Sequence, residues 1–236
     1  INANLVFPSG AVRTVNTNGV TPVFTLYNRL ELRGAGYSLR GIPLTLAEGI
    51  QHKPSPANAT NTVAFDLDLL GDLSVQNDSG LLRLAGDIDL AGYDLDLTSI
   101  GDTRLTGQLR GGGQLIKTGA GLFELGSTND PNAFTGEIVA EVGTLEVTGN
   151  FRAGTTRVQS GAILSGDGTV NSVTVEPGGR VTPGFNGAGA LTARGMTFAS
   201  GGVLAVNLYP TGSANTNRLH AGPGNLVLSN ATLELN

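Results

Sequence analysis

The sequence contains no cysteine and no tryptophan, and charged residues form only 14% of it. An ordinary globular domain has about 25% charged residues. The two lysines and twelve arginines are scattered singly, so the clustered cations that nucleic acids and anionic membranes require are missing. No apolar run approaches the roughly 18 residues needed to cross a bilayer. The lack of cysteine leaves the compartment open, because the reducing cytosol and disulfide-free secretion both permit it.

Aromatic residues are also few, at 5%, whereas glycine is abundant, with 36 among 236 residues. This glycine content is about twice the usual value of roughly 7%. A core must therefore be built from Leu, Val, Ile and Ala, with glycine at the turns. The apolar content of 39% is too high for a disordered chain, and the formal net charge is only −5. The composition predicts a folded, weakly acidic protein.

Apolar and polar residues alternate in short runs, and no apolar stripe recurs at helical spacing. In residues 62–75 one parity is apolar and the other carries Asp66, Asp68 and Asp72. Residues 82–90 and 93–97 repeat the pattern, with Tyr93 expected inward. Further strands are predicted at Gly113–Leu125, Ile138–Val147, Thr155–Leu164, Thr169–Val175, Leu191–Phe198, Val203–Leu208 and Leu226–Leu235.

The turns favour one architecture among the all-β folds. Sandwiches and barrels usually carry aromatic residues and Asn-Gly or Asp-Gly hairpins, whereas here single or paired glycines recur every few residues. This pattern is typical of the corners of a solenoid. We therefore predict a right-handed parallel β-helix (β-solenoid) of roughly ten coils, with about 20–25 residues in each. It forms one unit over residues 1–236, with degenerate coils in 1–110, clearer repeats in 111–236 and a polar loop at Gln51–Asn61.

Residues 113–147, GQLIKTGAGLFELGSTNDPNAFTGEIVAEVGTLEV, resemble the autotransporter-associated β-strand repeat. Its usual form is G-x-L-x-K-x-G-x-G-x-L-x-L, then N-x-Y-T-G, then G-T-L-x-V. Phe134 stands in place of the Tyr, and Asp130–Ala133 is a small insertion. Residues 162–208 and the tail 217–236 are similar to the coils that follow in such passengers, although Asn217 stands where an Asp is usual. The matching positions are Gly113, Leu115, Lys117, Gly119, Gly121, Leu125, Asn129, Phe134, Thr135, Gly136, Gly143, Thr144, Leu145 and Val147.

The resemblance implies a passenger that is exported to the surface of a Gram-negative cell or secreted, in many relatives by a C-terminal outer-membrane barrel. We expect that barrel elsewhere in the parent chain, because this sequence begins at Ile1 and ends inside an apparent strand, as a segment of a longer protein would. The expected role is a rigid stalk or an adhesin-type display rod, monomeric and not an enzyme. Expected partners are surface glycans or receptors on host or neighbouring cells, with no nucleic acid and no cofactor.

Three aspartate pairs are the strongest candidates for chemistry: Asp66/Asp68, Asp87/Asp89 and Asp94/Asp96. Carboxylates at positions i and i+2 share one strand face, and stacked coils place such pairs about 4.8 Å apart. They could serve a polysaccharide lyase or hydrolase, or hold Ca²⁺. Arg83 and Arg104 are the only cations expected near them. The alternative, which we favour, is that these aspartates keep an outward face soluble and discourage edge pairing.

The remaining motifs have simpler structural interpretations. His52 and His220 lack local partners for a zinc site and are expected at the surface. Gly111–Thr118 imitates a phosphate loop, but Ile116 stands where a Gly is required before Lys117. The paired glycines and the Ser-Gly dipeptides are interpreted as turns: Gly34/Gly36, Gly222/Gly224, Ser160-Gly161 and Ser200-Gly201. The single aromatic residues are interpreted as core residues, in preference to groups that stack on a sugar: Tyr27, Tyr37, Tyr93, Tyr209 and Phe185.

No residue is therefore assigned a catalytic, cofactor-binding or metal-binding role. A trimeric fibre like a phage tailspike is a third functional possibility. Leu145 and Val147 are expected in the core, where an aspartate would be an unpaired buried charge and would unfold neighbouring coils.

Overall fold

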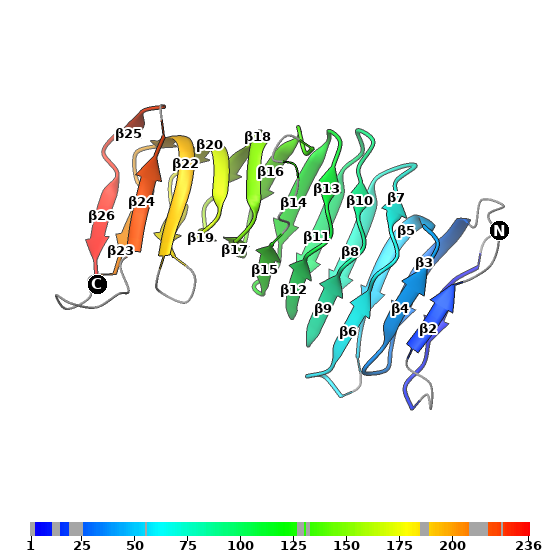
Figure 1. The fold of residues 1–236 in the computed structure, drawn as a ribbon. Helices are drawn as coiled ribbons and strands as arrows, with labels where there is room; N and C mark the ends of the chain where they lie inside the picture. Colours follow the sequence, from blue (N-terminus) through cyan, green and yellow to red (C-terminus); the bar gives the residue numbers. More distant parts are fainter. Residues whose placement is uncertain are drawn as a thin grey trace.

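The chain forms a parallel β-solenoid in the computed structural model, which describes residues 3–10, 15–18, 26–54, 56–126, 130, 133–184, 189–207, 217–222 and 224–236. These residues form strands and turns and contain no helix. The strands stack in chain order, from blue at one end of the molecule to red at the other (Figure 1). Two long sheets and one short sheet form the faces of the stack. The all-β solenoid predicted from the alternating runs is confirmed.

The first long sheet has twelve strands, and eleven of them follow one path from the N-terminal to the C-terminal end. The twelfth strand of this sheet, β25 (Leu226–Leu228), pairs with β22 beside that path. The strands of the path are β1 (Leu5–Phe7), β3 (Leu26–Leu32), β5 (Thr45–His52), β8 (Leu73–Asn77), β11 (Leu95–Ser99), β14 (Gln114–Thr118), β16 (Glu137–Ala140), β18 (Asn150–Val158), β20 (Thr169–Val175), β22 (Gly189–Phe198) and β24 (Asn217–Ala221).

The second long sheet has eleven strands in one path, and a short sheet of three strands forms a third face over the coils of residues 67–110. The short sheet contains β7 (Leu67–Asp68), β10 (Ile88–Asp89) and β13 (Leu109–Arg110). The strands of the second long sheet are β2 (Val15–Asn18), β4 (Ser38–Gly41), β6 (Thr60–Val63), β9 (Leu81–Leu84), β12 (Asp102–Leu105), β15 (Leu122–Leu125), β17 (Gly143–Val147), β19 (Ala162–Gly166), β21 (Arg180–Pro183), β23 (Val203–Val206) and β26 (Thr232–Leu235).

Neighbouring strands come from successive coils and pair in parallel. In the first long sheet, for example, Leu73 is the register partner of Leu95, and Leu95 is the partner of Leu115. With the partly described turns at the two ends set aside, the regular stack has about eight turns, fewer than the roughly ten expected. Each strand therefore contributes one rung to a continuous ladder of backbone hydrogen bonds.

Several predicted strands are in fact two strands on different faces, joined by a corner. The run 113–125 contains β14 and β15, and a turn at residues 119–121 separates them. The runs 138–147, 155–164 and 226–235 divide in the same way. In the runs 113–125 and 155–164 the buried residues keep the same parity through the corner, so parity alone did not mark the change of sheet there.

The core is one continuous cluster of buried apolar side chains that runs from Leu30 to Leu204. Leu145 and Val147 are both 0% exposed, which confirms their inward assignment. Tyr93 is 40% exposed, so its predicted inward orientation is wrong. It follows the turn residue Ala91, which has φ of 51°, and the strand resumes only at Leu95.

The polar segment Gln51–Asn61 is a loop only in its middle. Strand β5 continues to His52 and β6 begins at Thr60, and His52 and Asn61 are both 0% exposed. The ends of this segment therefore belong to the interior of the coil, in contrast to the predicted excursion.

Gly113 shows why corners of the repeat require glycine. Its φ is +97°, a conformation that L side chains rarely adopt. A Cβ at this position would also lie 2.0 Å from the carbonyl oxygen of Tyr93 in the preceding coil. The glycine therefore permits both the turn and the close stacking of two coils.

Candidate functional site

The aspartates at the corners bind backbone amides of the next coil. Oδ1 of Asp66 accepts a hydrogen bond from the N–H of Asp87 at 2.8 Å, and Oδ1 of Asp87 accepts one from the N–H of Gln108 at 2.8 Å. The three residues precede β7, β10 and β13, so one carboxylate per coil continues the ladder of the short sheet. These side chains therefore close a gap in backbone pairing.

A second column repeats this arrangement at the start of the first long sheet. Oδ1 of Asp72 accepts from the N–H of Asp94 at 3.0 Å, and Oδ1 of Asp94 accepts from the N–H of Gln114 at 2.7 Å. Burial, followed by repulsion from the carboxylates of Asp94 and Asp72, raises the pKa of Asp96. The structure thus stacks Asp66/Asp68 on Asp87/Asp89 along the short sheet, whereas Asp94/Asp96 lies apart from them in the first long sheet, next to Asp72.

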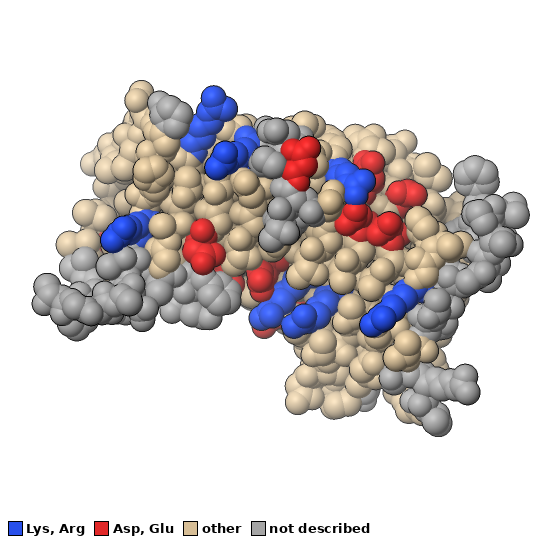
Figure 2. Space-filling view, in the orientation of Figure 1, with Lys and Arg blue, Asp and Glu red and all other residues tan. Residues whose placement is uncertain are grey.

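The cation beside the acidic corners is Arg110, which the sequence interpretation missed. Its guanidinium forms an ion pair with Oδ2 of Asp87, and its Nε donates to Oε1 of Gln108 at 2.8 Å. The expected cations, Arg83 and Arg104, instead lie next to each other in register on β9 and β12 of the second long sheet. Figure 2 shows carboxylates gathered over the end of the molecule that contains β7 and β10.

His52 lies inside the solenoid, so its predicted surface position is wrong. Its Nδ1 is 2.7 Å from Oδ1 of Asn77, and its Nε2 is 3.0 Å from Nδ2 of Asn61. Because an amide oxygen only accepts and an amide nitrogen only donates, this network assigns the ring proton to Nδ1. Burial lowers the pKa of His52, while its hydrogen bond to Asn77 opposes that effect.

The two asparagines extend this buried network along the corner between the long sheets. Asn61 accepts from the N–H of Tyr37 at 2.7 Å and donates to the carbonyl oxygen of Gly34 at 2.8 Å. Asn77 donates to the carbonyl oxygen of Asp102 at 2.7 Å and to Oγ1 of Thr103 at 3.1 Å. These contacts satisfy buried backbone groups at the turns, which indicates a structural role for the network.

Lys117 continues the polar interior of the same corner and is 0% exposed. Its Nζ donates to the carbonyl oxygens of Thr118 at 2.8 Å, Gly119 at 2.7 Å and Val142 at 3.1 Å. Burial lowers the pKa of its ammonium group to about 8. Lys117 therefore ties together the corners of two coils, a position incompatible with a phosphate loop.

On the second long sheet, Glu146 lies beside Glu124 in register and is only 7% exposed. Nε of Arg104 is 2.9 Å from Oε2 of Glu124, so the cation pairs with one carboxylate of the two. Burial, together with repulsion from Glu124 and Asp167, raises the pKa of Glu146 to about 7. The burial of Glu146 keeps any substrate from this pair of carboxylates, so the pair has a structural position.

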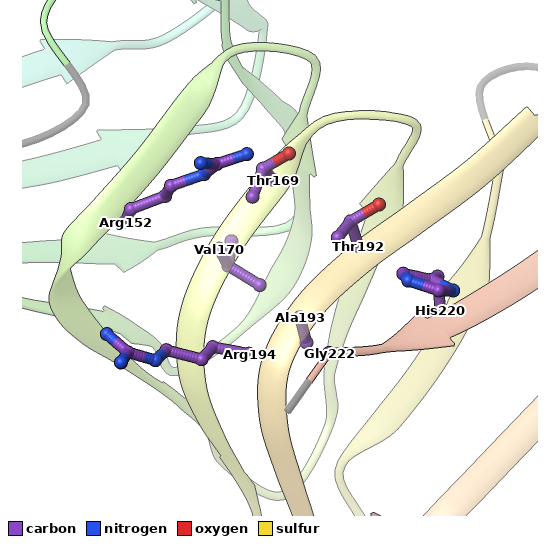
Figure 3. Close-up of a pocket in the computed structure, with 8 residues that line it drawn as sticks. All are labelled: Arg152, Thr169, Val170, Thr192, Ala193, Arg194, His220 and Gly222. Atoms are coloured by element: carbon purple, nitrogen blue, oxygen red, sulfur yellow. The ribbon is translucent and has the colours of Figure 1, made fainter. Parts of the chain in front are cut away.

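A groove crosses the outer face of β18, β20, β22 and β24, and its volume is about 340 Å³. Thr169, Thr192 and His220 are register partners on three neighbouring strands, and all three line it. His220 is exposed, as expected. Figure 3 shows Arg152 extending toward Thr169, whereas Arg194 extends from β22 back across β20. The lining residues are Arg152, Thr169, Val170, Thr192, Ala193, Arg194, His220 and Gly222.

The groove lies where the first long sheet bends. The pairing of β18 with β20 shifts register between Phe151 and Thr155, and such bulges turn side chains in new directions. On the other side, β24 ends at Ala221 and the N–H of Gly222 donates to the carbonyl oxygen of Ala193 at 2.7 Å. The irregular backbone at this bend places Arg152 on the rim of the groove.

The guanidinium groups of Arg152 and Arg194 are exposed and form no ion pair within the described ranges of the chain. A smaller hollow of about 250 Å³, lined by Ser172, Arg194, Gly195 and Gly224, adjoins the groove at Arg194. Figure 2 shows cations over β18–β22, at the other end of the visible face from the acidic corners. The bend therefore forms a locally positive, hydroxyl-lined surface on an acidic protein.

The other candidates have structural positions. Gly34 and Gly36 lie in the turn between β3 and β4, and Ser160-Gly161 and Ser200-Gly201 are turns. Tyr37 is buried, and its hydroxyl donates to the carbonyl oxygen of Pro8 at 2.6 Å. Tyr27 packs partly buried against the core, whereas Phe185 and Tyr209 lie outside the described residues, as does Asn129.

Within the described ranges, no cluster of three or more His, Cys, Asp or Glu side chains has the arrangement of a metal site. Nor do those ranges contain a helix long and apolar enough to span a bilayer. The chain matches no protein-family model, no curated protein and no solved structure. The function of the chain is therefore inferred from its own geometry and from the resemblance of residues 113–147 to the autotransporter-associated repeat.

Proposed function

We propose that this chain is a rigid segment of a bacterial surface or secreted protein, which spaces or displays other parts of that protein outside the cell. The observation that carries the proposal is the unbroken parallel pairing along both long sheets. Eleven strands at about 4.8 Å spacing give a stack roughly 50 Å long. A rod of this kind suits a stalk or an adhesin-type passenger.

The corner chemistry supports a mechanical role over catalysis at the aspartate pairs. The Oδ1 atoms of Asp66, Asp72, Asp87 and Asp94 all accept hydrogen bonds from backbone amides of the adjacent coil. Carboxylates held in this way brace one coil against the next. A hydrolase or lyase would need carboxylates free to exchange protons with a substrate.

The test places residues 1–236 between a secretion signal and an autotransporter outer-membrane barrel in a Gram-negative host. We expect the segment to reach the cell surface and to resist protease added to intact cells, because a continuous ladder offers few cleavable loops. Retention inside the cell, or immediate digestion at the surface, would contradict the proposal. Light scattering of the isolated segment should give a monomer, whereas a trimer would favour a tailspike-like fibre.

The runner-up is a polysaccharide lyase or hydrolase that uses the acidic corners. Incubation of the purified segment with bacterial, plant and animal polysaccharides should release no new reducing ends. Release that disappears in Asp87→Asn or Asp94→Asn would overturn the mechanical proposal and make the corners an active site.

A further inference from the structure

We propose that the groove across β18, β20, β22 and β24 binds an acidic oligosaccharide, that is, a sugar chain carrying carboxylate or sulfate groups. This inference goes beyond the rod, which needs no ligand. None of the eight described lining residues is acidic, and two of them are arginines without a counterion. Unpaired guanidinium groups bind carboxylates and sulfates through two parallel hydrogen bonds.

The positions of the two arginines favour an extended ligand over a single ion. Arg152 belongs to β18 and Arg194 to β22, with β20 between them. Two strand spacings separate the backbones by roughly 10 Å along the stack. Their side chains reach different parts of the groove (Figure 3). A chain with an acidic group at intervals can contact both, whereas one small anion would contact one.

The rest of the lining favours a sugar over a nucleic acid. Thr169 and Thr192 lie side by side in register, with Arg152 on one side of them and His220 on the other (Figure 3). Each hydroxyl both donates and accepts, which matches the hydroxyl groups of a sugar ring. The net charge of −5 opposes long polyphosphates elsewhere on the surface, and the described lining contains no Phe, Tyr or Trp on which successive bases could stack.

The test is calorimetric titration of the whole chain with five defined probes: an oligogalacturonate, a heparin-derived oligosaccharide, neutral maltohexaose, inorganic sulfate and a single-stranded oligonucleotide. We expect at least one acidic oligosaccharide to bind, more weakly as NaCl rises from about 50 to about 200 mM. The two acidic probes distinguish carboxylate from sulfate recognition. Arg194→Gln and Arg152→Gln should each weaken binding by about tenfold, because each removes charge-assisted hydrogen bonds.

Arg83→Gln is the matched control, because Arg83 is also exposed and without an ion pair in the described residues but lies on β9 of the second long sheet. It makes the same change in net charge and should leave affinity unchanged. All three arginine side chains are exposed, so the variants should keep the wild-type melting temperature.

Four outcomes would overturn the proposal. One is that neither acidic oligosaccharide binds, and another is that maltohexaose binds equally well. An equal loss of affinity in Arg83→Gln would mean that general charge, and not the groove, attracts the ligand. Sulfate ions or a single-stranded oligonucleotide binding as tightly as the acidic sugars would show that the site recognises anions without regard to sugar.

Discussion

The backbone N–H of Asp87 donates a hydrogen bond to Oδ1 of Asp66, 2.8 Å away and one coil earlier in the chain. Asp87 in turn receives the N–H of Gln108 from the following coil. Each corner carboxylate therefore stabilises the contact between its own coil and the next. These surface aspartates extend the hydrogen-bond ladder, and the free energy that they contribute can be measured.

Asp87→Ala should lower the free energy of unfolding by about 1–3 kcal/mol, because it leaves the amide of Gln108 and the guanidinium of Arg110 without their partner. Asp87→Asn keeps an oxygen acceptor and should cost less. Urea unfolding followed by circular dichroism measures both. Asp68→Ala is the control: Asp68 is exposed on the neighbouring strand and its side chain forms no hydrogen bond or ion pair with the described residues, so the loss should stay within about 0.5 kcal/mol. Equal losses for Asp68→Ala and Asp87→Ala would refute the bracing role.

Lys117→Met should destabilise the fold by about 1–3 kcal/mol at pH 7, because three buried carbonyl oxygens lose their donor. The loss should also depend on pH. Between about pH 8 and pH 10.5 the unfolded lysine holds a proton that the folded lysine has released, so wild-type stability rises with pH across this window. The Met variant lacks that rise, and the gap between the two proteins should widen by at most about 3 kcal/mol.

Lys53→Met is the control for Lys117, since Lys53 is 50% exposed and pairs with Asp78 at the surface. Its unfolding free energy should track that of the wild type through the alkaline range. A gap between wild type and Lys117→Met that stays constant from pH 8 to pH 10.5 would show that Lys117 titrates as an ordinary lysine.

Glu146→Gln should stabilise the protein above neutral pH. The folded carboxyl has a pKa of about 7 and the ordinary value is 4.5, so wild-type stability falls as pH rises from 4.5 through 7. The variant should therefore match the wild type at pH 4.5 and exceed it at pH 8, by at most about 3 kcal/mol. Thermal unfolding of both proteins across this range checks the sign. Glu48→Gln, at an exposed glutamate, is the control and should not gain stability relative to the wild type between pH 4.5 and pH 8. A Glu146→Gln variant that is less stable than the wild type at pH 8 would contradict the assignment.

Leu145→Asp should unfold the neighbouring coils, with a loss above about 4 kcal/mol, because it places an unpaired charge at a fully buried position. Val142→Asp introduces the same charge three residues away, at a side chain that is 46% exposed. It should change stability by less than about 0.5 kcal/mol. Similar melting temperatures for the two variants would mean that the core does not depend on Leu145.

The alternation of polar and apolar residues was enough to predict the strands and the solenoid. It was not enough to predict which side chains meet when one coil stacks on the next. The sequence matched Lys117 to the repeat but did not place it in the interior, because its partner Val142 lies in another coil and could not be identified without the register. The shared groove of Arg152 and Arg194 could not be predicted for the same reason. The two residues are 42 positions apart in the sequence, on strands separated by one intervening strand. Their groove depends on a bulge that no residue pattern marks.

The predicted surface position of His52 was wrong for a different physical reason. It sits at the edge of a polar, proline-containing segment, which favours a solvent-exposed interpretation. The structure instead satisfies both ring nitrogens with asparagine side chains from its own coil and the next. A buried histidine becomes predictable only when both partners are known, because burial without them would be unfavourable.

Asp66, Asp87 and Gln108 follow one another at intervals of 21 residues, each bonded to the next. If residues 67–87 were excised, the carboxylate of Asp66 would meet the amide of Gln108, and the joint would close with the same bond. Duplication of that stretch would add a joint of the same kind. Unequal recombination within such a gene would therefore change the length of its product in whole coils that carry the same carboxylate–amide bond at this corner. Selection could then adjust the reach of the molecule one coil at a time.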